Sequence, residues 1–403
     1  MRQSCFLVRY FVKERNLKLD NAKGILITLV VIGHMLLPIQ GTTRGVTNFF
    51  YMIYAFHMPA FVFISGLLAQ RINGRRWCST LWLYLLFQFI VFFSEIPAYG
   101  RTTRFPDFLH VSGAPWYLLA LLIWYLMIPL FDACRGKVRP VWRSASERPS
   151  RSDGRAPQRD RPAAGGSEAS GSRSRQRGIP YSLIAWILLT IMSLAGGYLA
   201  SGALAGIGDF LALDRVIAFA PFFFAGYFIG PERLMRFFGA KHAGRSIVLL
   251  TALGLLCFVL IGTQTFDRLL PYKNVVYGAW YYRFYPERNP AAYPGALATQ
   301  LWLIRLAWFL VSGLMSFALL ALMPNQQIPL ITTIGQRTLQ IYILHRPIRD
   351  LLLASGFITA AGPENITHVL LLIALSILLT IVLSAGILQR LFDAIQKLPE
   401  RLL

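Results

Sequence analysis

Long apolar stretches are the feature that most restricts how this chain can fold. A helix needs roughly 17 to 25 apolar residues to cross the hydrocarbon layer of a bilayer. About ten such stretches lie near residues 19–38, 48–69, 79–97, 115–133, 180–200, 210–230, 246–263, 299–322, 331–355 and 366–388. Of the 403 residues, 55% are hydrophobic, and the mean hydropathy of +0.51 excludes a set of soluble domains. The sequence therefore predicts an all-α, polytopic membrane protein with about ten transmembrane helices.

Basic residues predict the orientation, because Lys and Arg are retained on the cytoplasmic side of short loops. With ten spans, every basic segment falls on one side. These segments are the N-terminus, the loop with Arg71, Arg75 and Arg76, the stretch after Cys134, the loop from Arg233 to Arg245, and the tail from Arg390 to Arg401. Both termini are predicted to be cytoplasmic. Residues 1–19 carry scattered charges and lack the apolar core of a cleaved signal peptide.

Residues 135–178 are rich in Arg, Ser, Gly and Pro and hold 12 of the 40 Lys and Arg residues. This composition predicts a disordered cytoplasmic loop. It separates four spans in residues 1–134 from six spans in residues 179–403. The loop has the charge to hold anionic membrane lipids, but a solvated insertion is the favoured interpretation. Since most of the net charge of +22 follows the topology, no nucleic-acid partner is expected.

The four cysteines do not form a recognisable site. Cys5, Cys78 and Cys134 lie on the predicted cytoplasmic side, and Cys257 lies within a span. Neither a disulfide framework nor a CxxC metal site is present, and no metal is expected.

Histidines within the apolar stretches are the main candidates for chemistry. Lys23 and His34 are separated by three helical turns plus about 20°, so they project from one face about 16 Å apart along the axis. An ionisable residue inside a span is costly unless it faces a polar interior, and is therefore a functional candidate. A hydrogen-bonded structural histidine is the alternative.

Two later stretches repeat this feature. The segment FHMPAFVFISG places His57 and Ser65 on nearly the same helix face, and TLQIYILHRPI places His345 beside Arg346 within a predicted span.

The order of these motifs resembles the acyltransferase 3 family of integral membrane O-acyltransferases, especially its fucose 4-O-acetylase-like branch. The first span of that family carries a basic residue, ten others and then His, which Lys23 and His34 match. The other similar segments are FHMPAFVFISG, RINGRRWCSTLWLY, APWYLLALLIWYLMIP, DRVIAFAPFFFAGYFIG and IYILHRPI. Two positions depart from the pattern: Lys23 stands where many members have Arg, and Leu121 or its neighbours stand where some members have an acid.

The resemblance implies transfer of an acyl group to a hydroxyl, which needs a general base within hydrogen-bond reach. We expect His34 to be that base and His57 to be a second catalytic histidine that orients the site. Asp20 is expected either to pair with Lys23 or to cap the first helical turn, and capping is favoured.

Supporting roles are expected for residues in the other similar segments. These residues are Ser65, Trp116, Arg215 and His345. Arg215 either pairs with Asp214, which is favoured, or faces the catalytic cavity.

The resemblance also implies an acyl-CoA donor, with acetyl-CoA favoured, whose phosphates require cations. Arg71, Arg75 and Arg76 lie on the predicted cytoplasmic side, and Arg binds phosphate bidentately. Lys23, one turn inside the membrane, is placed to hold the donor as it enters. A purely topological role for the three arginines is equally open.

The favoured function is therefore transfer of an acyl group from acyl-CoA to a hydroxyl of an envelope carbohydrate or glycolipid, in a bacterial cytoplasmic membrane. A transporter or flippase with buried His and Arg residues is the leading alternative, and an inactive relative that assists polysaccharide export is another. Aromatic residues in the predicted external loop 264–298 form either a sugar platform or, as favoured, an interfacial belt.

Overall fold

The computed structural model describes residues 16–41, 43–70, 72–100, 103–111, 113–134, 181–198, 210–269, 300–362, 364–396 and 398. Within these ranges the backbone is helical apart from turns, short loops and one isolated β-bridge, between His110 and Phe210. The predicted 135–178 loop, the aromatic part of the 264–298 loop, and Arg71 lie outside the described residues.

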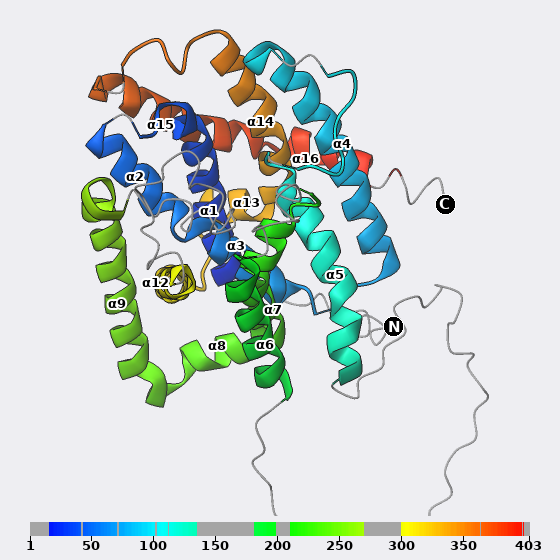
Figure 1. The fold of residues 1–403 in the computed structure, drawn as a ribbon, viewed down its shortest axis with the longest axis vertical. Helices are drawn as coiled ribbons and strands as arrows, with labels where there is room; N and C mark the ends of the chain where they lie inside the picture. The colour runs from blue at the N-terminus through cyan, green and yellow to red at the C-terminus, as the bar shows by residue number, and fades with distance from the viewer. Residues whose placement is uncertain are drawn as a thin grey trace, which may run out of the picture.

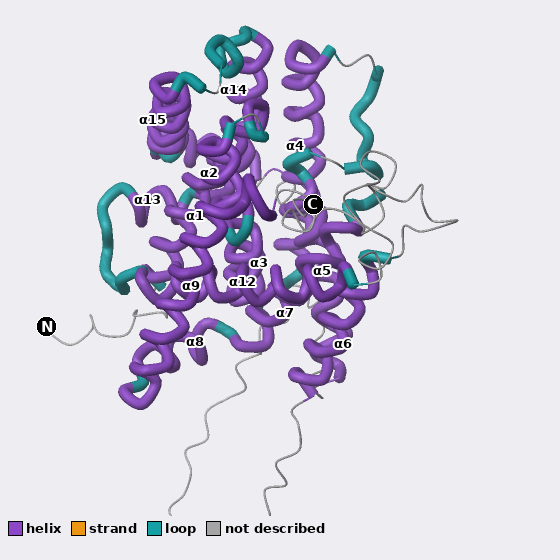
Figure 2. Tube along the Cα trace, turned by 60° about the vertical axis from the view of Figure 1, so that its left-hand side comes forward, coloured by secondary structure: helices purple, strands orange, loops and turns teal. Residues whose placement is uncertain are grey.

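The helices form one bundle, with α1 near its centre (Figure 1). In chain order they are α1 Leu17–Leu36, α2 Arg44–Tyr54, α3 His57–Leu68, α4 Gly74–Tyr99, α5 Trp116–Cys134, α6 Tyr181–Gly196, α7 Leu213–Ile229, α8 Pro231–Gly239, α9 Gly244–Gln264, α12 Leu301–Leu322, α13 Ile331–Gln336, α14 Thr338–Ala354, α15 Ile366–Leu383 and α16 Gly386–Gln396. Figure 2 shows that helices, joined by loops, make up most of the described chain.

Six helical segments of the described chain are long and apolar enough to cross a membrane. The pair α7 and α8, bent by 75°, makes a seventh if it is counted as one span, and α5 and α6 contribute shorter apolar helices. The prediction of an all-α polytopic membrane protein is thus confirmed. The count of ten spans and the cytoplasmic side of the termini remain predictions.

The predicted span at 48–69 consists of two helices, α2 and α3, that meet at Ala55 and Phe56. A helix break frees backbone groups that must find partners, since lipid cannot supply them. Here the carbonyl of Ala55 accepts hydrogen bonds from Trp308 Nε1 at 3.2 Å and from the Ser312 hydroxyl, both on α12. The break starts α3 at His57, so it determines where that histidine lies.

Small residues let α3 and α7 pack closely. A Cβ atom added at Gly66 would overlap the carbonyl oxygen of Phe223, and one at Gly226 would overlap that of Phe63. Such backbone contact is typical of helix packing in membranes, where van der Waals contact replaces the hydrophobic driving force.

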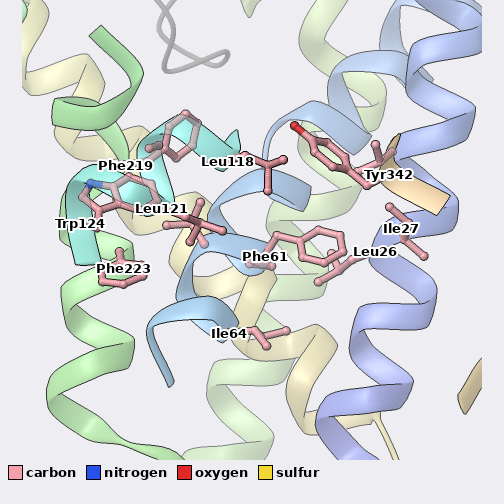
Figure 3. Close-up of a cluster of buried hydrophobic side chains, with 14 of the residues drawn as sticks. Leu26, Ile27, Phe61, Ile64, Leu118, Leu121, Trp124, Phe219, Phe223 and Tyr342 are labelled. Carbon is pink, nitrogen blue, oxygen red and sulfur yellow. The ribbon is translucent and has the colours of Figure 1, made fainter. Parts of the chain in front are cut away.

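A continuous apolar cluster joins α1, α3, α5 and α7 (Figure 3). Trp124 of α5 stacks on Phe223 of α7, with ring centroids 4.9 Å apart, and both side chains are fully buried. Leu26 of α1 and Ile64 of α3 lie in the same cluster. This packing fixes the helices that surround the site described next.

Candidate active site

His34 and His345 lie against each other, although 311 positions separate them in the sequence. His34 Nδ1 and His345 Nε2 are 2.7 Å apart, and the two rings are nearly parallel, with an interplanar angle of 19°. His345 is completely buried, whereas His34 retains some exposure. The last turn of α1 and the middle of α14 therefore form a histidine pair deep in the bundle.

A network of buried charges lies beside this pair, on α14 and the end of α4. Arg346 forms ion pairs with Glu95 at 2.8 Å and with Asp350 at 3.2 Å. Arg349 pairs with the other oxygen of Asp350 at 2.8 Å, and Ser94 donates a hydrogen bond to Asp350 at the same distance. Each buried charge thus has a partner, as a buried charge requires.

The network also holds the backbone of the catalytic candidate. Arg349 Nε donates a hydrogen bond to the carbonyl oxygen of His34, at 3.1 Å. This carbonyl lies at the end of α1, where a helix leaves its last carbonyls without intrahelical partners. The contact ties the position of His34 to the charged face of α14.

His57 is linked to the pair through an aromatic ring. Its Nδ1 lies 2.8 Å from the carbonyl oxygen of Ile53, and its ring packs edge-on against Tyr54, with centroids 4.7 Å apart. Tyr54 in turn packs on Gly33, because a Cβ there would come within 2.7 Å of the Tyr54 ring. His57 therefore supports the turn that carries His34.

A cavity of about 270 Å³ lies between α1, α3, α4, α5 and α14. Lys23, Arg76 and Gln396 give it polar groups, while Ile27 and Phe61 are among its apolar walls (Figure 3). The cavity is therefore amphipathic, with two cations among its lining residues.

The directions of α1, α4 and α14 indicate which part of the bundle the cavity approaches. Contacts of Tyr342 with Phe87 and of Arg346 with Glu95 show that α4 and α14 run in the same direction. Lys23, Ile27 and Val30 follow one face of α1, and Tyr342 is the last cavity residue on α14. His34 is the next residue on that face of α1, about 6 Å beyond Val30. The cavity thus extends from Lys23 in the direction of the histidine pair, although neither His34 nor His345 is among its lining residues.

A family model described as an acyltransferase domain matches residues 16–385 of this chain. The protein belongs to the acyltransferase 3 family. Its long apolar helices and its family together make it an integral membrane protein of that family.

Two curated relatives are similar to part of this chain. The nodulation protein NolL of Mesorhizobium japonicum is 35% identical over an alignment of 138 residues, and the match covers 28% of this chain and 35% of that protein. NolL of Sinorhizobium fredii is 35% identical over 137 residues, covering 30% and 37% of the two chains. The matched region spans only about a third of either relative's length. No solved structure matches the chain.

Asp20 pairs with Lys23 rather than capping α1. The Asp20 and Lys23 side chains form a 2.8 Å ion pair, whereas Asn16 is the N-cap and accepts from the Leu19 N–H at 3.1 Å. The favoured capping role was wrong because α1 begins three residues earlier than Asp20, so that Asp20 lies within the first turn.

Of the arginines proposed to bind the donor, Arg76 lines the cavity and lies over the ring of Tyr125 at 5.7 Å. Arg75 and Arg76 are both exposed, but Arg75 is not among the cavity-lining residues of the described chain. Ser65 also lines the cavity, where its hydroxyl lies 2.5 Å from that of Tyr117.

Arg215 and Trp116 are neighbours at the start of α7 and α5. The Arg215 guanidinium lies 5.6 Å from the centre of the Trp116 ring and donates to the carbonyl of Val111 at 3.2 Å. Trp116 also stacks on Phe219, so it packs between α5 and α7. These contacts place the two residues together, near the loop that precedes α5.

Sequence reasoning missed Arg349, Asp350 and Ser94. The first two extend the Arg346 pattern along one face of α14, at spacings of three and four residues. That spacing of charges in a predicted span is a signal that points to them. Nothing in the sequence pairs Ser94 with Asp350, because the contact joins distant segments.

Proposed function

We propose that this protein transfers an acyl group, with acetyl favoured, from cytoplasmic acyl-CoA to a hydroxyl of an envelope glycan or glycolipid in the bacterial cytoplasmic membrane. The single observation that carries the proposal is the cavity that begins at Lys23 and Arg76 and runs toward the His34–His345 pair.

The cavity has the chemical character that an acyl-CoA donor requires. Lys23 and Arg76 supply cations for the phosphate groups of the donor. The apolar walls beyond them, including Val30 and Leu118, suit a thioester arm more than a charged group. Because the cationic end comes first, the acyl group is directed toward His34.

His34 is the base in the proposed reaction. It removes the proton from the acceptor hydroxyl as the oxygen attacks the thioester carbonyl carbon. The new C–O bond forms, the C–S bond breaks, and the thiolate of CoA takes the proton from the His34 imidazolium. The products are the O-acyl ester and CoA with a free thiol, and His34 returns to its neutral form.

The proposed acceptor is a carbohydrate that reaches the histidine pair from the side opposite the donor. A carbohydrate hydroxyl follows from the resemblance to the fucose 4-O-acetylase-like branch. We propose that it approaches from the side opposite Lys23, where the loop with Asp107 and His110 follows α4. The two substrates then meet at the histidine pair inside the membrane.

Replacement of His34 by Gln tests the proposed function. Gln keeps a polar side chain but has no basic nitrogen, so transfer should fall by roughly a hundredfold to ten-thousandfold, as expected for loss of a general base. Acetyl transfer is measured in membranes at matched protein levels, and binding of CoA is measured by calorimetry in detergent.

His242→Gln is the matched control, because His242 is exposed and lies in the short helix that precedes α9. It should leave transfer unchanged. Near-normal O-acylation by the His34→Gln protein would contradict the proposal, and a transport assay would then test the alternative class.

A further inference from the structure

We infer that His345 is a positioning residue that fixes the tautomer of His34 and leaves His34 Nε2 as the basic atom. The inference rests on the proposed function, because it explains how His34 is made ready to act as a base. Hydrogen bonds at both nitrogens of His345 support it.

The hydrogen of neutral His345 lies on Nδ1. This nitrogen lies 2.9 Å from the carbonyl oxygen of Ile341, one turn earlier on α14. A carbonyl oxygen only accepts hydrogen bonds, so His345 Nδ1 must carry the hydrogen. His345 is fully buried, and no water is needed to complete this bond.

The tautomer of His345 determines which nitrogen of His34 carries the hydrogen. In a neutral imidazole, one nitrogen donates and the other accepts. Since Nδ1 of His345 is the donor, its Nε2 has the lone pair. The atom 2.7 Å away, His34 Nδ1, must then be an N–H donor. The lone pair of His34 is left on Nε2.

The charges around the pair favour a neutral His345. An imidazolium at His345 would donate from both nitrogens and turn His34 Nε2 into an N–H group, which cannot act as a base. It would also add a third cation beside Arg346 and Arg349, whose charges Glu95 and Asp350 already balance. The neutral form avoids that excess of positive charge.

The arrangement has a further use during the reaction. When His34 Nε2 takes the proton from the acceptor, the His34 ring becomes a cation whose Nδ1–H still points to the lone pair of His345. The hydrogen bond becomes charge-assisted and therefore stronger. His345 thus stabilises the transient imidazolium in the way that an orienting partner does in other base dyads.

Nitrogen NMR of protein labelled with ¹⁵N-histidine tests this inference directly. The chain has 6 histidines, so that resonances can be assigned by single substitutions. We expect His34 to be in the Nδ1–H tautomer, although free histidine in water favours Nε2–H. A resting His34 in the Nε2–H tautomer would overturn the inference.

Two substitutions of His345 supply the kinetic test. His345→Leu removes the acceptor, so His34 should lose its Nδ1–H preference, and kcat should fall by roughly tenfold to a hundredfold, as for other partners that orient an imidazole. The KM for acetyl-CoA should not change. His345→Gln retains an acceptor oxygen near the position of Nε2 and should recover part of kcat.

Each outcome separates this inference from the proposed function. Loss of activity in His34→Gln, together with full kcat in a folded His345→Leu protein, would overturn only the role of His345. Equal kcat in the Leu and Gln variants would also count against it, because a purely structural role predicts no rescue by an acceptor. Activity in His34→Gln would overturn the proposed function itself.

Discussion

The adjacent arginines at the start of α4 differ in their position relative to the cavity. Arg76 lines it and Arg75 does not, within the described residues. Arg75 and Arg76 have the same charge and lie at nearly the same depth along α4. A role in topology would therefore be shared by both residues, whereas phosphate binding in the cavity would depend on Arg76.

Arg76→Ala should therefore weaken CoA binding, and Arg75→Ala should have a smaller effect. A lost charge-assisted contact costs about 1.5 to 3 kcal/mol, which is roughly tenfold to a hundredfold in Kd. Calorimetric titration with CoA in detergent measures both variants. Equal changes in CoA affinity for the two variants, or no change in either, would indicate that both arginines act only in topology.

Lys23 offers a second test of the same end of the cavity. Lys23 pairs with Asp20 and also lines the cavity. Lys23→Arg should retain transfer, because the positive charge is kept. Lys23→Ala should lose CoA affinity by a similar factor of about ten to a hundred. Transfer assays at matched protein levels compare them. A fully active Ala variant would exclude Lys23 from the donor site.

Removal of one partner from the buried ion pair between Glu95 and Arg346 should destabilise the protein strongly. Glu95→Leu leaves an excess of buried positive charge, and breaking such a pair costs about 3 to 5 kcal/mol in unfolding free energy. The double variant Glu95→Leu, Arg346→Met restores the balance and should recover most of this loss. Denaturant titration in detergent measures it, and a stable single variant would contradict the expectation.

At the scale of elements, close packing of α3 on α7 depends on two glycines. Gly66→Ala should destabilise the protein by about 1 to 3 kcal/mol, because the added Cβ meets the backbone of α7 rather than a movable side chain. Gly313→Ala is the matched control, since the space around that glycine in α12 is open. It should be neutral or stabilise by up to about 1 kcal/mol. Thermal unfolding in detergent distinguishes them, and equal midpoints would remove the packing argument.

The sequence was sufficient to predict most of these elements but not how they meet. Apolar length predicted the membrane helices, and spacing predicted that Lys23 and His34 share a face, which Ile27 and Val30 continue. The break between α2 and α3 was not predicted, because the carbonyl at the break is satisfied by α12, far along the chain. The contact of His34 with His345 is equally long-range, and neither segment alone specifies it.

At the scale of the whole molecule, we expect the Lys23 end of the cavity and the far end of α4 to face opposite sides of the membrane. Gln396 lines the cavity beside Lys23, whereas Asp107 follows the far end of α4, a helix of 26 residues. Such a helix is about 39 Å long, enough to cross a bilayer. In protein whose native cysteines are replaced by Ser, Asp107→Cys should react with a membrane-impermeant maleimide from outside intact cells. Gln396→Cys should not, and the reverse pattern would invert the proposed orientation.

The balance of charge beside the histidine pair also has a consequence for an energised membrane. A single charge that crosses the whole membrane field changes in energy by about 2.3 kcal/mol per 100 mV. The two guanidinium groups and two carboxylates of the network sum to zero, so the field exerts opposing forces that cancel across the cluster. The proton also passes from the acceptor to His34 and on to the departing thiolate within a short distance. Voltage should therefore neither strain the pair nor set the rate of turnover.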